Sequence, residues 1–243
     1  MERGILPAMG EASDIFAATK TLTFDCYGTL IDWEAGLKSA LAGLFGDAAL
    51  DGRATEVFDA YVEAEAAVEE EAYRPYREVL AEAARRVATL FDLAAPTDPD
   101  GFMAGHLKDW PPFQDTNAAL KRLAAICRLG ILSNIDRDLL DATMRHLEVP
   151  FDFTVTAEDV RAYKPAHLHF LRFLNAHGGR EGGLHVAQSL FHDGVPAAQL
   201  DLPFVWINRR GQAPPSGSDG ARPIAIYPDL AAFADDICGC GER

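Results

Sequence analysis

The sequence predicts an α/β protein in which a core built on a parallel sheet carries an inserted helical cap. Short apolar runs alternate with helical segments along most of the chain, as they do in sheets built from βαβ units. The first run contains Leu22 and Phe24, and the later runs lie at residues 129–133, 153–156, 184–188 and 204–208. Residues 32–112 have a helical pattern almost throughout, which indicates an insertion after the first strand.

The domain boundaries follow from these two patterns. We expect the core to comprise residues 14–31 and 113–243, and the cap to comprise residues 32–112. A connector at residues 110–112, which contains two prolines, closes the cap. Residues 1–12 contain acids and glycines and lack the apolar centre of a signal peptide, so we expect a disordered lead-in there.

The cap is expected to consist of several helices. Apolar side chains recur at helical spacing over residues 37–45 and again over residues 79–91, so each stretch predicts a helix with one buried face. The acid-rich segment at residues 63–71 is typical of a helix face exposed to water. Pro75 marks a break between helices. The segment at residues 96–101, rich in Pro, Asp and Gly, predicts a loop.

The last part of the chain extends the predicted sheet. Residues 211–223 are rich in Gly, Pro and Ser and predict a surface loop, and a late strand is expected near residues 224–227. A chain of 243 residues with 49% hydrophobic residues is long enough to bury a substantial core and still carry an insert. The core is therefore expected to be a Rossmann-like parallel sheet.

The charge and hydropathy of the chain limit its partners. The formal net charge is -15, with no basic stripe to offset it, which argues against binding to nucleic acid or to an anionic membrane surface. No run of about 18 apolar residues is present, so no transmembrane helix is expected. A small anion can still bind where positive groups and backbone N–H donors converge. We therefore expect a cytoplasmic protein that acts on a small molecule.

Asp25 is the best candidate for a functional residue. It ends the first apolar run and is followed at once by a turn at Gly28. Ligands of open α/β sheets bind in the crevice outside the carboxyl ends of the strands, so this carboxylate is expected to face a substrate. A buried aspartate is costly unless it is paired or functional. A desolvated and aligned carboxylate can act as a nucleophile.

Four segments in the expected order resemble the motifs of the haloacid dehalogenase superfamily. The first contains Asp25, Gly28, Thr29 and Leu30; the others contain Ser133 and Asn134, Lys164 and Pro165, and Asp193. Each segment falls at a predicted strand end or in a loop, and the resemblance spans residues from about 20 to about 210. It implies that Lys164 returns to the crevice and keeps Asp25 ionised and oriented. It also implies that Ser133 and Asn134 bind an anion or cap the following helix.

Two residues distinguish this chain from the phosphatases of that superfamily. The phosphatases carry a second aspartate, a general acid, at the position of Tyr27, and a phenol of pKa about 10 is a poor substitute for it. They also carry a magnesium-binding aspartate at the position of Gln188, whose neutral amide cannot supply the charge. Both differences argue against metal-dependent phosphate hydrolysis, and the resemblance implies that no metal or other cofactor is needed.

The first motif more closely resembles that of the 2-haloacid dehalogenases. A halide leaving group needs no proton, so a site without a general acid suits dehalogenation. The resemblance implies that Asp25 displaces halide from a short 2-haloalkanoic acid and forms an aspartyl ester. Water activated near Asp193 and Lys164 then hydrolyses this ester to a 2-hydroxy acid. Tyr27 is expected to line the pocket, and three side chains are expected to hold the substrate carboxylate or orient the nucleophile: Thr29, Ser133 and Asn134.

Some positions depart from the dehalogenase pattern. Leu190 and His192 stand where those enzymes carry Asn and Trp, and His192 is either a donor or base in the pocket or a helix cap. The arginine that cradles the departing halide has no counterpart in the matching segment, residues 56–61. Tyr61 is one replacement for it; the next helix offers two arginines, Arg74 and Arg77.

Three other functions remain as alternatives. A phosphatase with a displaced acid would depend on magnesium. Hydrolysis of a strained-ring amino acid would use the same Asp25 alkylation, but it would need a proton donor such as Tyr27 or His192. A binding protein on a degraded scaffold is disfavoured because Asp25, Lys164 and Asp193 are all present. The resemblance is also compatible with a homodimer, since cap helices in this family often form the interface between subunits.

Overall fold

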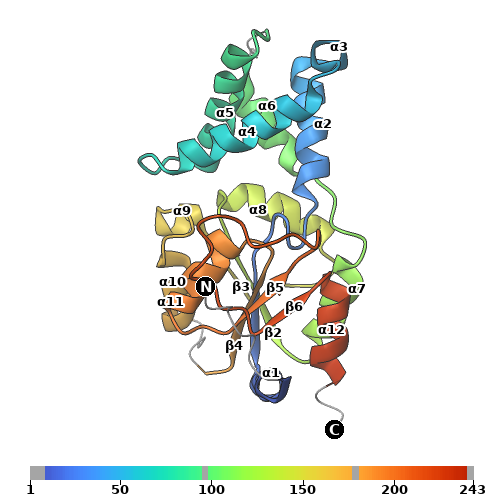
Figure 1. Ribbon diagram of the computed structural model, residues 1–243, viewed down its shortest axis with the longest axis vertical. Helices are drawn as coiled ribbons and strands as arrows, with labels where there is room; N and C mark the ends of the chain where they lie inside the picture. Colours follow the sequence, from blue (N-terminus) through green and yellow to red (C-terminus); the bar gives the residue numbers. More distant parts are fainter. Residues whose placement is uncertain (1–8, 95–97, 177–180, 240–243) are drawn as a thin grey trace.

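The computed structural model describes residues 9–94, 98–176 and 181–239, and it contains a six-stranded parallel sheet in the order β3-β2-β1-β4-β5-β6 (Figure 1). The strands are β1 (Thr21–Phe24), β2 (Arg128–Ser133), β3 (Phe153–Thr156), β4 (Gly183–Ala187), β5 (Phe204–Ile207) and β6 (Ala225–Tyr227). The predicted α/β class with a parallel sheet and an inserted helical cap is confirmed. The exact domain boundaries stay a prediction.

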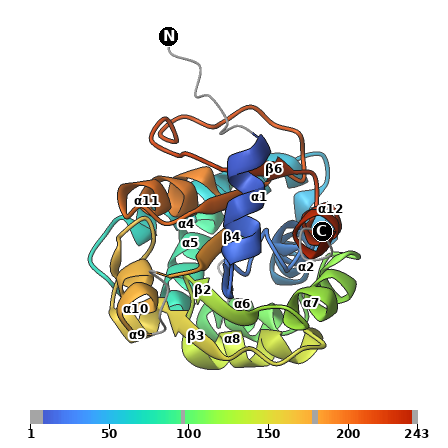
Figure 2. The same cartoon turned by 90° about the horizontal axis from the view of Figure 1, so that it is seen from below.

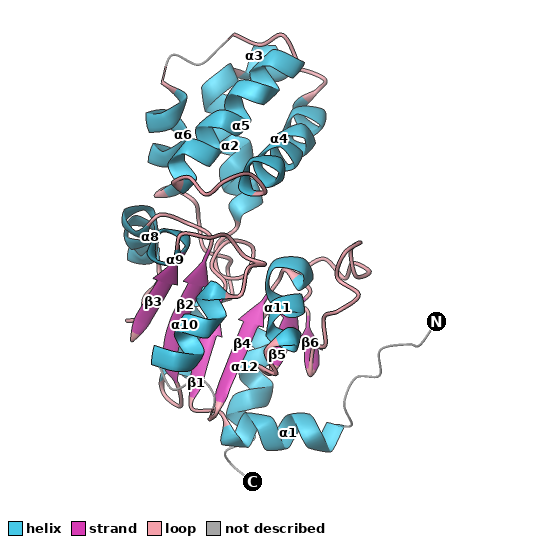
Figure 3. Cartoon of the chain, turned by 90° about the vertical axis from the view of Figure 1, so that its left-hand side faces the viewer, coloured by secondary structure: helices cyan, strands magenta, loops and turns pink. Residues whose placement is uncertain are grey.

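Strand β1 lies at the centre of the sheet. Its Leu22 and Phe24 side chains are fully buried, and Phe24 pairs in register with Ile131 of β2 and Val186 of β4. Parallel strands that are covered on both faces form such continuous apolar runs. The carboxyl ends of the strands point towards the cap (Figure 3). Asp25, which follows β1, therefore lies at the middle of this edge.

Helices cover both faces of the sheet, as Figure 2 shows from below. On one side, α7 (Thr116–Ala124) packs against α12 (Leu230–Gly239), with α1 (Met9–Ala18) beside α12. On the other side lie α10 (Leu168–Ala176) and α11 (Val195–Gln199). Shorter helices at the carboxyl edge and beyond it are α8 (Arg137–Thr143), η1 (Met144–His146), α9 (Ala157–Val160) and η2 (Leu190–Gly194).

Helix α1 corrects one expectation from the sequence. It begins at Met9, inside the stretch of residues 1–12 that was expected to be disordered. Phe16 of α1 packs edge-on against Phe233 of α12, and this apolar contact explains why the helix is ordered. Residues 1–8 lie outside the described residues. In the described part of the chain, no helix is both long and apolar enough to cross a membrane.

The cap is a group of helices above the carboxyl edge of the sheet (Figure 1). It contains α2 (Trp33–Phe45), α3 (Asp47–Leu50), α4 (Ala54–Glu69), α5 (Tyr76–Leu90) and α6 (Pro99–Leu107), with α5 packed against both α4 and α6. The expectation of a loop at residues 96–101 is wrong for residues 99–101. Asp98 accepts a hydrogen bond from the Gly101 N–H, and Pro99 occupies the first turn, so these residues start α6.

Contacts at the connecting segments and at the start of α5 help to join the cap to the core. The connecting segments run side by side, because Ile31 bridges to Pro112 and the Asp32 N–H donates to the Pro111 carbonyl at 2.8 Å. In addition, the buried Asp136 carboxylate of the core accepts hydrogen bonds from the backbone N–H of Tyr76, at 2.7 Å, and of Arg77, at 3.1 Å. A core side chain thus caps the first turn of α5, where helix N–H groups lack partners.

Candidate active site

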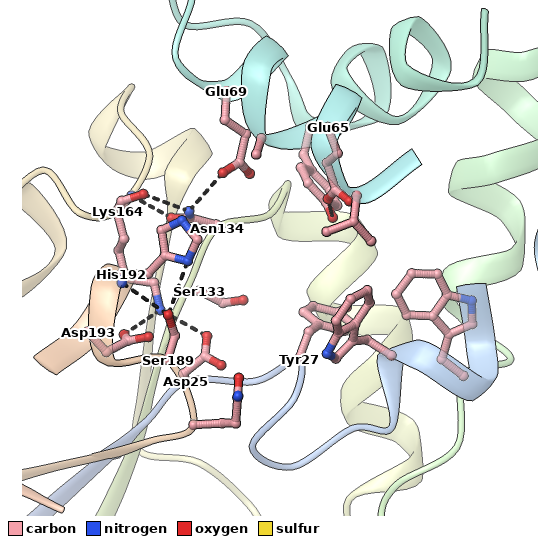
Figure 4. A pocket seen from close by; sticks show the side chains of 16 residues that line it. Asp25, Tyr27, Glu65, Glu69, Ser133, Asn134, Lys164, Ser189, His192 and Asp193 are labelled. Carbon is pink, nitrogen blue, oxygen red and sulfur yellow. Dashed lines mark hydrogen bonds and ion pairs between the residues drawn. The ribbon is translucent and has the colours of Figure 1, made fainter. Parts of the chain in front are cut away.

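A cavity of about 310 Å³ lies between the carboxyl edge of the sheet and the cap (Figure 4). Asp25, Ser133, Lys164 and Asp193 line it from the core, and Glu65 is among the residues that line it from the cap. A crevice at this edge is where open α/β sheets bind ligands. The strand-end reasoning applied to the sequence is therefore consistent with where these side chains lie.

Asp25 is held rigidly by the loop that follows it. The Thr29 hydroxyl donates to Asp25 Oδ2 at 3.1 Å and accepts from the Gln188 N–H at 3.0 Å, which ties the loop after β1 to the loop after β4. Gly28 has φ +96°, and a Cβ there would come within 3.3 Å of the Trp33 and Gln188 side chains. Only glycine combines this backbone conformation with so close an approach.

Lys164 bridges the two buried carboxylates. Its Nζ donates to Asp25 Oδ1 at 2.9 Å, to Asp193 Oδ1 at 2.7 Å and to the Leu132 carbonyl at 2.9 Å, so each of its three protons has an acceptor. Burial alone would lower the pKa of Lys164, but Asp193 and Asp25 raise it above its ordinary value. Lys164 therefore remains charged and orients both carboxylates.

The two carboxylates differ in how firmly they hold their charge. Burial raises the pKa of Asp25 above its ordinary value, while Lys164 acts in the opposite direction. Burial would also raise the pKa of Asp193, but Lys164 and His185 outweigh it and hold that pKa below its usual range. Asp193 lines the cavity, and its buried Oδ2 has no partner among the described residues, so this oxygen can accept a proton or a hydrogen bond.

His185 is a residue that the sequence reasoning missed. It lies in the buried strand β4, where its Nε2 bonds with Asp193 Oδ1 at 3.0 Å and its Nδ1 with the Thr23 hydroxyl at 2.9 Å. Through these bonds, His185 orients the Asp193 carboxylate. A histidine in the middle of an otherwise apolar strand was the available signal, because a buried imidazole needs polar partners.

Ser133 and Asn134 have different surroundings although they are neighbours. Ser133 is 1% exposed and lines the cavity, and its buried hydroxyl has no hydrogen-bond partner among the described residues. The Asn134 amide spans the loop that carries Lys164, accepting from its N–H at 2.7 Å and donating to its carbonyl at 3.1 Å. Ser133 is thus available to a ligand, whereas Asn134 mainly positions Lys164.

The aromatic and histidine candidates differ in whether they line the cavity. Tyr27 lines the cavity, its hydroxyl bonds with Thr143 at 2.7 Å, and burial raises its pKa well above the ordinary value of 10. His192 lines the cavity and bonds with the Ser189 hydroxyl at 3.2 Å, and burial lowers its pKa. Tyr61 does not line this cavity. Its ring is fully buried inside the cap, and its hydroxyl donates to the Leu80 carbonyl at 3.0 Å.

The two arginines considered as halide ligands also point elsewhere. Arg74 pairs with Glu71 at 2.5 Å, and Arg77 pairs with Asp136 at 3.0 Å and Asp138 at 2.6 Å. Neither arginine borders the cavity, and no other arginine is among the described residues that do. Tyr61, Arg74 and Arg77 are engaged in contacts that hold the cap together or join it to the core.

Two acids of the cap face the cavity and overturn one expectation. Glu65 and Glu69 belong to the acid-rich segment expected to form a helix face exposed to water, yet both are half-buried and line the cavity. Burial raises the pKa of Glu65 to about 7, and the Tyr76 hydroxyl donates to its carboxyl. Burial, with the neighbouring Glu65, raises the pKa of Glu69. A signal was present, because they share one helix face with the apolar Val62.

A raised Glu65 pKa makes folding stability depend on pH. Glu65 has an ordinary pKa of 4.5, so between pH 4.5 and 7 the folded state holds a proton that the unfolded state has lost. Stability therefore falls as pH rises through this window. We expect Glu65→Gln to raise the Tm at pH 8 by the equivalent of about 1 kcal/mol and to leave it unchanged near pH 4.5. Thermal melts at both pH values measure this.

Glu63→Gln is the matched control for that prediction. Glu63 is an exposed residue of the same helix, and its substitution changes the net charge equally. We expect it to give the same small Tm change at both pH values. If Glu65→Gln also changed the Tm equally at pH 4.5 and pH 8, the elevated Glu65 pKa would be wrong.

The residues present do not fit a magnesium ion. Magnesium prefers several oxygen ligands, commonly carboxylates, in octahedral geometry. Here one oxygen of Asp25 and one of Asp193 are taken by the Lys164 ammonium, and the nearby position 188 carries a neutral glutamine. Within the described residues, no group of three or more His, Cys, Asp or Glu side chains is arranged to hold a metal.

The fold and the cavity together define a capped α/β enzyme with a buried aspartate at the end of its central strand. Residues 19–186 match the model of the haloacid dehalogenase-like hydrolase family. The chain belongs to this family and is a hydrolase of that class. No sequence among curated proteins is similar enough to count as a match.

Several solved structures share the fold over most of the chain. The L-2-haloacid dehalogenase RSc1362 has 22% identity and a TM-score of 0.77, over 90% of this chain and 99% of that one. L-2-haloacid dehalogenase from Xanthobacter autotrophicus with chloropropionic acid covalently bound has 20% identity and a TM-score of 0.76, over 91% and 99%. The putative hydrolase YfnB from Bacillus subtilis, bound to magnesium, has 18% identity and a TM-score of 0.75, over 90% and 98%.

Proposed function

We propose that this chain is a hydrolytic dehalogenase that displaces halide from a short 2-haloalkanoic acid and releases a 2-hydroxy acid. The observation that carries the proposal is the Asp25–Lys164–Asp193 array beside a Tyr27 that is unsuited to acid catalysis. Burial raises the pKa of Tyr27, and its hydroxyl is engaged with Thr143. The alkoxide that leaves a phosphate ester when the nucleophile attacks needs a proton, whereas a halide does not.

In the first half of the reaction, Asp25 acts as the nucleophile. Lys164 and Thr29 hold its two oxygens, and this fixed orientation favours attack on the carbon that bears the halogen. The Asp25 oxygen forms a bond to that carbon, the carbon–halogen bond breaks, and the halide leaves with the electron pair. The product is an ester of Asp25 with inverted configuration at carbon. The covalently bound chloropropionic acid of the Xanthobacter protein supports extending a covalent intermediate to this chain.

In the second half, water attacks the carbonyl carbon of that ester. Asp193 Oδ2, the carboxylate oxygen without a partner among the described residues, takes one proton from the water. The tetrahedral intermediate collapses, and the departing alkoxide takes the proton from Asp193 to become the 2-hydroxy acid. Asp25 is left as a carboxylic acid and loses its proton to solvent. The net reaction consumes one water and yields one halide and one proton.

Isotope labelling in a single turnover tests this route. With enzyme in excess over 2-chloropropanoate, in water labelled with oxygen-18 and with a chelator present, the hydroxyl oxygen of the product is expected to be unlabelled. It comes from Asp25, and mass spectrometry of the peptide is expected to find the label in the Asp25 carboxyl group. Labelled product in the first turnover would mean that water attacks the substrate directly.

A control on the reaction type uses the same preparations. Both enantiomers of 2-chloropropanoate and chloroacetate are tested for halide release, and a phosphate ester is tested with and without magnesium. We expect halide release that is unaffected by the chelator. Failure to release halide from all three compounds, together with magnesium-dependent hydrolysis of the phosphate ester, would identify a phosphatase instead.

A second candidate is favoured by one observation, the position of Glu65. Hydrolysis of a strained-ring amino acid by the same Asp25 alkylation needs a proton for the leaving nitrogen. Glu65 lines the cavity from the cap with a pKa of about 7, so it is a better donor than Tyr27. Ring opening without halide release would support this candidate over dehalogenation.

A further inference from the structure

The cap side of the active-site cavity is acidic. Glu65 and Glu69 lie one turn apart on α4, and Figure 4 shows both carboxyl groups directed from this helix towards the core. Glu65 is held by the Tyr76 hydroxyl, and Glu69 has one long contact of 3.4 Å with the Asn134 amide. Neither glutamate has a lysine or arginine partner within ion-pair distance among the described residues.

The charges around the cavity favour a ligand that carries a cationic group besides its carboxylate. Among the described residues that line it, four carry carboxyl groups, namely Asp25, Glu65, Glu69 and Asp193, and one carries an amine, Lys164. The amine already donates to both core carboxylates and to a backbone carbonyl, so no proton remains for a ligand. An added negative charge therefore finds no free lysine or arginine among the described residues that line the cavity.

A second feature on the opposite wall indicates where the acidic end of a ligand binds. Ser133 is 1% exposed, and its buried hydroxyl has no partner among the described residues. Figure 4 shows it directed into the cavity, below the two glutamates. A buried hydroxyl without a partner is costly, and a ligand carboxylate would accept a hydrogen bond from it. The cavity thus has a hydrogen-bond donor on the core wall and two acceptor groups on the cap wall.

We infer that the substrate is a zwitterion, with its carboxylate at Ser133 and an ammonium group held by Glu65 and Glu69 of the cap. This deepens the proposed function and rests on it, because it specifies which 2-substituted acids the site selects. An ammonium group offers three donors, which two carboxylates can accept, and such charge-assisted hydrogen bonds are stronger than neutral ones. The specificity therefore resides in the cap, and the Asp25 chemistry resides in the core.

The protonation of Glu65 agrees with this assignment. The titratable groups around it are Tyr61 and Glu69 on the same helix, Tyr76 on α5 and Tyr163 of the core. Burial raises the pKa of Glu65 to about 7 when the cavity holds no cation. A bound ammonium group stabilises the carboxylate form and lowers that pKa. Binding of the zwitterion therefore releases protons near pH 7 and becomes tighter as pH rises from 6 to 8.

Binding measurements with matched ligands test the inference without requiring turnover. The ligand 5-aminopentanoate and its isostere hexanoate differ only in an ammonium group that replaces a methyl group, and shorter pairs, such as 4-aminobutanoate with pentanoate, vary the span. By calorimetry at pH 8, we expect the amino acid of the best-fitting pair to bind at least about tenfold more tightly than its isostere. The double variant Glu65→Gln/Glu69→Gln is expected to abolish this preference.

The double variant Glu63→Gln/Glu70→Gln is the matched control. It changes the same number of charges, one within α4 and one at its C-cap, but both residues are exposed, so the preference is expected to persist. If the unmodified protein binds every alkanoate as tightly as its amino counterpart, the inference is overturned. It is also overturned if Glu65→Gln/Glu69→Gln keeps the preference.

The outcome separates this inference from the proposed function. Halide release from 2-chloropropanoate without any preference for ammonium ligands would leave the dehalogenase proposal standing and remove the inference. Preferential binding of the amino acids that disappears in Glu65→Gln/Glu69→Gln, without halide release from any chloro acid, would support the inference and reject dehalogenation.

Discussion

Replacing Asp25 by asparagine is expected to reduce halide release by at least about 10⁴-fold, the scale at which removal of an enzyme nucleophile acts. Asparagine has the same shape, and its single amide oxygen can still accept the hydrogen bond of Lys164. A neutral amide is, however, a far weaker nucleophile than a carboxylate. The loss is therefore expected in the chemical step and not in folding. Initial rates of halide release, thermal melts and ligand binding by calorimetry measure these three effects separately.

Asp59→Asn is the control for that variant. Asp59 is an exposed residue of α4, so the same chemical change is made where the side chain does not border the cavity. We expect it to keep the parental rate. Retention of more than about one hundredth of the parental rate in Asp25→Asn, with intact folding, would show that another group is the nucleophile.

Replacing Lys164 by methionine is expected to cost about 3 kcal/mol of unfolding free energy as well as activity. Methionine fills a similar volume, so the main change is the loss of a charge that is 2% exposed and lies 2.9 Å from Asp25 and 2.7 Å from Asp193. Two buried carboxylates then face each other without compensation. For a chain of this size, the expected fall in Tm is roughly 6–12 °C.

The loss in Lys164→Met is expected to be larger at pH 8 than at pH 5. Without the lysine, burial and mutual repulsion raise the folded-state pKa of the Asp25–Asp193 pair above the unfolded value. The folded state then holds a proton at pH 5 that relieves the repulsion, and stability falls as pH rises through that raised pKa. Thermal melts at the two pH values measure the difference.

Two further variants test whether the lost lysine charge causes the fall in Tm. Lys164→Met/Asp193→Asn removes one of the two facing carboxylates and is expected to recover part of the lost Tm. Lys121→Met is the exposed control, because Lys121 pairs with Glu148 on the surface and such pairs contribute little. An equal loss of Tm in both lysine variants would contradict the role assigned to Lys164.

The core part of the site could be predicted because its residues follow strand ends. Asp25, Ser133 and Asp193 come after or at the ends of β1, β2 and β4, and parallel strands bring their carboxyl ends to one edge of the sheet. Interactions between residues close in sequence then orient the side chains, as in the hydrogen bond from Thr29 to Asp25. Lys164 was placed by family resemblance, since a lysine before a proline has no distinctive pattern of its own.

The sequence by itself determined the fold class and placed Asp25, Ser133 and Asp193 at or after the ends of strands. Only the tertiary structure decided which cap residues face the cavity: it directed Tyr61 into the cap and turned Glu65 and Glu69 towards Asp25. Helical periodicity tells which residues share a face, but the partner of that face depends on contacts between distant segments. The contact of Asp136 with the start of α5 is one such long-range contact. Contacts of this kind set the position of the cap, and they therefore place two acids that were expected to face water along the cavity.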